Sequence, residues 1–140
     1  MTERFALDRF VTAQGGGVYE AALAELRRGR KTTHWMWYVF PQIAGLGFSP
    51  TARHYAISSL DEARAYLAHP VLGPRLREVT EAVASGPAAD AGSLLGSVDA
   101  QKLRSSMTLF ARADPEEPLF RTVLERYFDG EPDPATDERL

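Results

Sequence analysis

A hydrophobic pattern with helical spacing recurs along most of this chain, and it constrains the fold more than any other feature. Apolar residues stand three and four positions apart in segments from Leu7 to Phe128, the spacing that places side chains on one face of an α-helix. No run that alternates between apolar and polar residues is long enough to compete with this pattern. The sequence therefore predicts an all-α fold, a compact multihelical domain of about six helices.

Turn and capping residues divide the pattern into separate helices. Residues 15–17 are three glycines, which disfavour helix and predict a turn between the first two helices of a helical hairpin. Gly29 stands where the second helix should stop. Further along the chain, Ser59 precedes Glu62 with the spacing of a capping box. Pro74 is expected as a first helical residue and Ser97 as an N-cap.

The domain organisation follows from the same pass along the chain. We expect residues 1–130 to form a single helical domain, because no repeat and no internal boundary interrupts them. Residues 131–140, EPDPATDERL, are polar and charged and contain two prolines. Such a segment has little apolar surface to bury, so we predict a disordered C-terminal tail.

Composition excludes several function classes. A chain of 140 residues that is 44% hydrophobic suits one ordinary soluble domain. It has no cysteine, which excludes disulfides and thiolate chemistry and fits a reducing cytosol. We expect a cytoplasmic protein with no membrane partner, because no stretch resembles a signal peptide or a membrane span. The net charge of −3, without a long basic stripe, argues against nucleic acid as a partner.

The segment HWMWYVF, residues 34–40, is ambiguous in secondary structure. Its aromatic and β-branched residues suit a buried strand, whereas Pro41 would end a buried helix, and periodicity does not separate the two in so short a run. Since the other strong signals are helical, we favour a short helix with Thr32 or Thr33 as its N-cap. A loop at residues 41–50 should follow it.

The same segment is also a candidate ligand site. Trp35, Trp37 and His34 carry polar groups that need partners when buried, so a purely structural core would rather use leucine. Gln42 offers an amide, and nearby glycines would let a ring lie against the indole faces. Aromatic clusters in helical domains also serve as core, and the sequence leaves both interpretations open.

A second candidate lies in the segment DAQKLRSS. Asp99, Lys102 and Ser106 share one side of the expected helix, where a desolvated lysine can act as a base toward a serine. The alternative is an exposed ion pair beside a small residue that lets helices approach each other. Arg104 adds a cation for an anionic ligand. The chain's three histidines are too widely spaced for a metal site, and we predict neither a metal nor a cofactor.

Three segments resemble a bacterial family of unknown function whose members are sometimes labelled calpastatin-like: GRKTTHWMWYVFPQIAGLG, HYAISSLDEARAYLAHPVLGPRL and KLRSSMTLF. The resemblance extends from Phe5 to Phe128 and implies a compact multihelical fold with no established activity. The stretch LRSSMTLFARADPEEPLFRTVL is similar to part of a helical family that includes riboflavin-pathway N-glycosidases, which act on ribosyl or ADP-ribose compounds.

Two functions are compatible with these features. The first is binding, or hydrolysis, of a nucleotide-like or ribosyl small molecule in an aromatic-lined pocket. Its candidate ligand-binding residues combine aromatic, amide, hydroxyl and basic groups: His34, Trp35, Trp37, Gln42, Lys102, Arg104 and Ser106. The second is a non-enzymatic protein-interaction module that displays the aromatic patch to an unknown protein partner. No residue is assigned a catalytic role.

Overall fold

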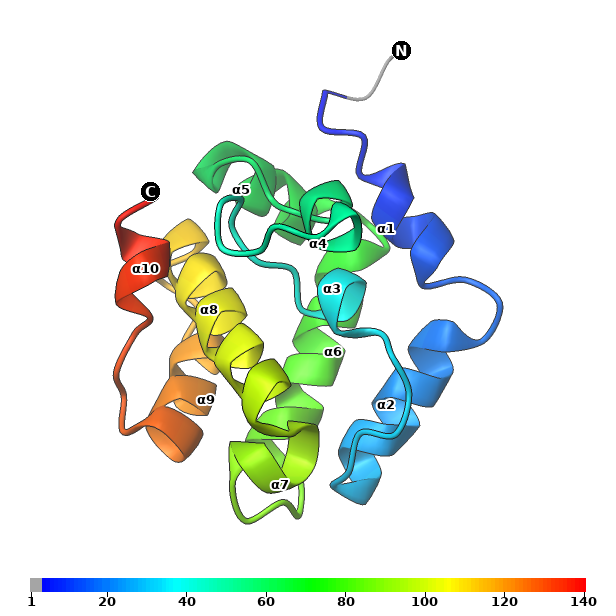
Figure 1. Cartoon of the computed structure of the whole chain (residues 1–140), viewed down its shortest axis with the longest axis vertical. Coiled ribbons are helices and arrows are strands. Elements are labelled where there is room, and N and C mark those ends of the chain that lie inside the picture. The colour runs from blue at the N-terminus through cyan, green and yellow to red at the C-terminus, as the bar shows by residue number, and fades with distance from the viewer. Residues whose placement is uncertain (1–3) are drawn as a thin grey trace.

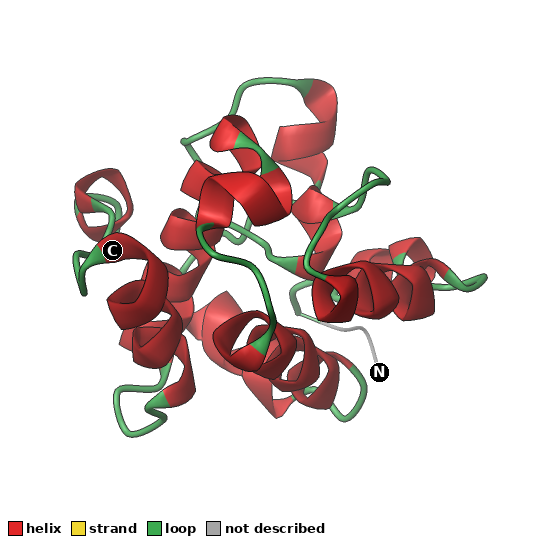
Figure 2. Cartoon of the chain, turned by 90° about the horizontal axis from the view of Figure 1, so that it is seen from below, coloured by secondary structure: helices red, strands yellow, loops and turns green. Residues whose placement is uncertain are grey.

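The computed structural model describes residues 4–140 and is all-α, as predicted (Figures 1 and 2). Within this range the backbone forms ten helices, and Ile43 and Ile57 form an isolated parallel bridge between two loops. The helices are α1 (Asp8–Ala13), α2 (Val18–Arg28), α3 (Met36–Val39), α4 (Pro50–His54), α5 (Leu60–Ala68), α6 (Leu72–Ser85), α7 (Ala91–Leu95), α8 (Ser97–Ala113), α9 (Leu119–Phe128) and α10 (Pro134–Asp137).

The number of helices exceeds the six that the sequence predicted. Five of the ten, α1, α3, α4, α7 and α10, have only four to six residues. A helix this short holds too few turns for a periodic pattern, and its own hydrogen bonds do not stabilise it without tertiary packing. Of these five, the sequence predicted α1 and α3, so the helices that it missed are α4, α7 and α10.

Several predicted helix ends are confirmed. Gly16 and Gly17 have φ angles of 64° and 87°, a left-handed conformation that suits glycine, and they separate α1 from α2. Gly29 ends α2, where its N–H donates to the carbonyls of Glu25 and Leu26. Ser59 Oγ accepts from the backbone N–H of Glu62 at 3.2 Å, which is one half of the capping box, whereas the Glu62 carboxylate accepts from the N–H of Ser58 at 2.7 Å rather than from that of Ser59.

Other helix ends differ from the prediction. Ser97 is the first residue of α8, and Gly96 occupies the N-cap position without a side-chain bond. α6 begins at Leu72 rather than Pro74. The cause lies in His69, whose Nδ1 accepts from the N–H groups of Val71 and Leu72 and so satisfies donors at the start of α6.

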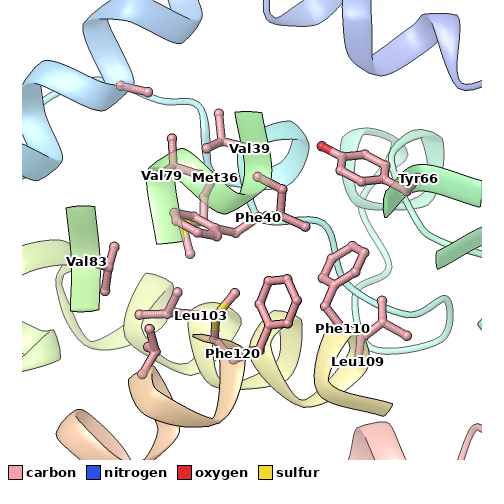
Figure 3. Packing of buried hydrophobic residues seen from close by; sticks show 14 of the residues in the cluster. Met36, Val39, Phe40, Tyr66, Val79, Val83, Leu103, Leu109, Phe110 and Phe120 are labelled. Carbon is pink, nitrogen blue, oxygen red and sulfur yellow. The ribbon is translucent and has the colours of Figure 1, made fainter. Parts of the chain in front are cut away.

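The core lies among the longest helices. α6 and α8 each contact both α5 and α9, while α2 packs on α6 and α10 packs on α8. Between α6 and α8 lie side chains of the α3 segment (Figure 3). There Met36 and Phe40 face Val79 on one side and Leu103 on the other. No helix in residues 4–140 combines the length and the apolar character that crossing a bilayer requires.

The α3 segment has one buried side and one half-exposed side. Trp35, Met36 and Phe40 are buried, whereas Trp37 and Tyr38 are half-buried. The predicted short helix is confirmed, but its N-cap is Trp35 and no side chain caps it. Thr33, one of the two expected caps, instead donates its hydroxyl to Glu25 at 2.6 Å. This segment is therefore core on one side and surface on the other.

Glu25 of α2 fixes the entry to this segment. Its buried carboxylate accepts from the backbone N–H groups of Thr32 and Thr33, from the Thr33 hydroxyl, and from Trp35 Nε1 at 3.0 Å. Burial alone would raise the pKa of Glu25, but these hydrogen bonds outweigh it and lower the pKa from 4.5 to about 2. One carboxylate thus orders the chain between α2 and α3.

Residues 131–140, expected to be disordered, instead pack along α8 and form α10 (Figure 1). Arg104 donates to the carbonyls of Glu131 and Pro132 at 3.0 and 2.9 Å. Arg112 forms a two-pronged ion pair with Asp137. Because polar side chains of α8 hold it, the segment is ordered with little apolar burial of its own.

We expect the two tryptophans to differ in their contribution to stability. Trp35 is 1% exposed, so Trp35→Ala should lower the free energy of unfolding by about 3–5 kcal/mol through the cavity and the unpaired Glu25. Trp37→Ala should lower it by about 1–2 kcal/mol, since this ring is only half-buried. Urea denaturation of both variants checks this, and equal losses would contradict the assignment of Trp35 to the core.

Because the pKa of Glu25 is lowered, we expect the free energy of unfolding to fall at acidic pH. The folded-state pKa of about 2 lies below the ordinary value of 4.5, so the stabilisation is complete above pH 4.5 and is lost as the pH falls toward 2. Glu25→Gln should lower the free energy of unfolding by about 3 kcal/mol at pH 7. Wild type and variant should converge near pH 2 in urea denaturation. Glu125→Gln, at an exposed position of α9, is the control and should leave the pH profile unchanged.

Candidate functional site

The main concave feature associated with the predicted site is a hollow of about 630 Å³, here called the α8 hollow. Its walls come from three parts of the chain: residues 37–52, the first half of α8, and residues 133–135. Trp37, Gln42 and Lys102 line it together, although they lie far apart in the sequence. Its volume falls within the range of small-molecule sites.

A smaller hollow of about 160 Å³ adjoins it on the side of α4. Trp37, Gln42, Gly47 and Ala52 line both hollows, so the two are neighbouring compartments. The loop passes close to α4 at Gly47, where an added Cβ would lie 2.7 Å from the Cβ of Ala52. Glycine at this position therefore lets the loop that forms the wall approach the helix.

Two lysines share one carboxylate beside the α8 hollow. Lys31 Nζ lies 2.9 Å and Lys102 Nζ 3.4 Å from the carboxylate oxygens of Asp99, and all three side chains are largely buried. Each ammonium also lies over an indole ring, Lys31 at 5.2 Å from Trp35 and Lys102 at 4.6 Å from Trp37. The three charged groups sum to one excess positive charge, which favours an anionic ligand.

Aromatic and amide groups stand next to this charge. Trp37 is half-buried, and the Lys102 ammonium occupies part of its ring surface by a cation–π contact. The side-chain amide of Gln42 has no hydrogen-bond partner within residues 4–140 and lines both hollows. A group with both donors and an acceptor is thereby available to a ligand.

A buried carboxylate forms another part of the lining of the hollow. Asp133 is 5% exposed, and its Oδ2 accepts from the hydroxyls of Ser105 at 2.9 Å and Thr136 at 2.6 Å. Its Oδ1 accepts from Gln101 Nε2 at 3.3 Å. No basic side chain pairs with Asp133 in the part of the chain that the structure describes. The hydrogen bonds that stabilise its negative charge therefore come from neutral donors.

The predicted site residues are not all brought together. Trp37, Gln42 and Lys102 line the α8 hollow, whereas Trp35 lies in the core with its indole N–H bonded to Glu25. His34 is exposed and lines neither hollow. We therefore leave Trp35 and His34 out of the candidate site.

Of the three candidates on α8, Lys102 lines the hollow, whereas Arg104 and Ser106 do not. Arg104 holds the C-terminal segment through the backbone of Glu131 and Pro132, which leaves it outside the hollow. Ser106 is fully buried, and its hydroxyl has no partner in the described range. Lys102 pairs with Asp99, so the expected approach of lysine to Ser106 is absent from residues 4–140. The geometry gives no serine–lysine pair.

Sequence reasoning missed Asp133, Gln101 and Ser105, which line the same hollow. A signal for Asp133 was present, because an aspartate followed by Pro134 is typical of an N-cap and first helical residue. For Gln101 and Ser105 no local signal exists, since their role depends on a segment far along the chain. Among the described residues, His, Asp and Glu side chains form no group of three that could hold a metal ion.

Comparison with known proteins places the chain in a family. The chain is similar over 99% of its length to the conserved hypothetical protein Rv1873 from Mycobacterium tuberculosis, with 98% of that chain covered. The two share 49% sequence identity, and their structures superimpose with a TM-score of 0.95. Comparison with curated proteins gives no match. A family model described as "Protein of unknown function (DUF1810)" matches residues 4–140, and the chain therefore belongs to this family.

Proposed function

We propose that this protein binds a nucleotide-like or ribosyl small molecule in the α8 hollow. The observation that carries the proposal is the position of the Lys102 ammonium, 4.6 Å from the centre of the Trp37 ring at a hollow of about 630 Å³. A cation, an aromatic surface and a free amide at one hollow suit a ligand that combines negative charge, a ring and hydrogen-bonding groups. We further propose that the protein is cytoplasmic, on the basis of its cysteine-free sequence.

The charge at this wall supports an anionic group on the ligand. Asp99 neutralises only one of the two lysines that contact it. Lys102 is the lysine that lines the hollow, so the uncompensated charge is available to a phosphate there. Lys31 contacts the other oxygen of Asp99 and can hold that carboxylate in place when Lys102 binds the ligand.

Trp37 and Gln42 supply the contacts for the rest of the ligand. The half-buried indole of Trp37 offers apolar surface for a base or for the C–H groups of a sugar. The amide of Gln42 can donate and accept, as base edges and hydroxyls require. Binding is the step that these groups support. Hydrolysis of a ribosyl bond would be detected as release of the sugar from a bound compound.

A protein-interaction module is the second candidate, and one observation favours it. Phe48 is 73% exposed and Val98 is 69% exposed, and both line the α8 hollow. Exposed apolar side chains beside a concave surface are typical of contacts with another protein. A partner that inserts an apolar side chain would use the same hollow without needing Lys102.

The indole signals of the two tryptophans provide the test. In a ¹H–¹⁵N NMR spectrum, titration with AMP and with ADP-ribose should shift the Trp37 indole signal and leave that of the buried Trp35 nearly unchanged. Trp37→Phe assigns the signals. We expect thermal unfolding to move to higher temperature at saturating ligand, as linkage requires.

Lys102→Met tests the role of the cation. It should weaken binding of AMP by about tenfold or more, while changing the free energy of unfolding by no more than about 1 kcal/mol. Arg28→Met, at an exposed position of α2, removes one charge at a distance and is the control. If no nucleotide or ribosyl compound shifts the Trp37 signal, the proposal is wrong. If binding survives Lys102→Met unchanged, the anion contact is elsewhere.

A further inference from the structure

We propose that Asp133 determines the specificity of the α8 hollow by accepting a hydrogen bond from a hydroxyl of a ribose whose phosphate lies at Lys102. The inference rests on the proposed function and narrows the ligand to a phosphorylated ribosyl compound. It assigns a binding role to the C-terminal segment, which the sequence alone suggested to be disordered.

The hydrogen bonds of Asp133 leave one acceptor position open. Each carboxylate oxygen can accept two hydrogen bonds. Oδ2 accepts two, from Ser105 and Thr136, whereas Oδ1 accepts only one, from Gln101 at the long distance of 3.3 Å. Since Asp133 is 5% exposed and lines the hollow, water has little access to it except from that side. A donor on a ligand would complete its bonding.

The surroundings of Asp133 favour a hydroxyl over an ammonium as that donor. Its neighbours on the wall are the amide of Gln101 and the hydroxyl of Ser105, neutral groups that both donate and accept. Gln42 and Ser49, which also line the hollow, are of the same kind. Hydroxyls donate and accept too, so a sugar matches this set of neighbours.

Asp133 is the one acidic residue among those that line the hollow, so an ammonium would find no second carboxylate in the lining. It would also enter a hollow where Lys102 already brings positive charge. A sugar phosphate has the complementary arrangement, with its negative charge for Lys102 and its hydroxyls for Asp133. The recognition of ribose hydroxyls by a carboxylate is a general solution in nucleotide-binding proteins.

The position of Asp133 does not depend on a ligand. Its backbone N–H donates to the Thr108 hydroxyl at 2.9 Å, and Arg104 binds the carbonyls of the two preceding residues. α8 therefore carries Lys102 and also fixes the segment that carries Asp133. Groups held in this way lose little conformational freedom on binding, which favours affinity.

The test compares AMP with 2′,3′-dideoxy-AMP, which keeps the base and the phosphate but lacks both hydroxyls. We expect wild type to bind the dideoxy compound about tenfold to a hundredfold more weakly than AMP. The shift of the Trp37 indole signal measures the binding of both compounds. Phosphoethanolamine, which joins a phosphate to an ammonium, and inorganic phosphate should bind more weakly than AMP. Equal binding of the two nucleotides, or tighter binding of phosphoethanolamine, would overturn the inference.

Asp133→Asn tests the carboxylate itself. Asparagine has nearly the same shape, and the hydroxyls of Ser105 and Thr136 can accept from its amide, so the fold has a way to keep its bonds. The variant should weaken AMP binding by about tenfold and bind the dideoxy compound as wild type does, removing the preference for hydroxyls. Glu138→Gln, which also removes one negative charge from the same segment but at an exposed position without an ion pair in the described part of the chain, is the control and should keep the preference.

The outcomes separate this inference from the proposed function. If AMP binds and the dideoxy compound binds equally, only the role of Asp133 is wrong. If neither AMP nor ADP-ribose shifts the Trp37 signal, the proposed function and this inference both fail. Should Asp133→Asn fail to fold, the comparison of the two nucleotides on wild type still decides whether the hydroxyls are recognised.

Discussion

The arrangement around the candidate site depends on the buried carboxylate of Glu25. It accepts four hydrogen bonds from three residues between α2 and α3: Thr32, Thr33 and Trp35. Because these bonds draw the indole of Trp35 inward, the neighbouring face of the short helix, with Trp37, turns toward the surface. The same bonds hold the backbone beside Lys31, which reaches Asp99 on α8. A single acid thus decides which tryptophan is core and which faces the hollow.

α8 carries both the core and the site, on different sides. Leu103, Met107 and Phe110 are fully buried in the hydrophobic cluster, whereas Lys102 and Ser105 line the hollow. The core side follows the helical period and is read directly from the sequence. The residues on the other side show no such period, because their roles depend on contacts with segments that are distant in the sequence. This explains why the fold was easier to predict than the site.

The sequence predicted correctly those turns and helix ends that depend on residues close together in the chain. The glycine turn before α2, the end of that helix at Gly29 and the cap at Ser59 each involve neighbours within a few residues, and the structure confirms them. The choice between Trp35 and Trp37 was not predictable, since it depends on Glu25, ten positions from Trp35 in the chain. The C-terminal segment was misjudged because its composition suggested disorder, while the bonds that order it come from arginines of α8.

The two charged groups of the hollow are held by separate partners. Lys102 contacts the Trp37 ring and Asp99, which it shares with Lys31, and Asp133 binds neutral donors, so no ion pair joins Lys102 to Asp133 in the described part of the chain. If these two opposite charges paired with each other, a ligand would have to break that ion pair before it could bind either group. Each wall instead holds its own charged group in place. A ligand with a phosphate at one end and hydroxyls at the other can then engage both walls without first breaking a bond between them.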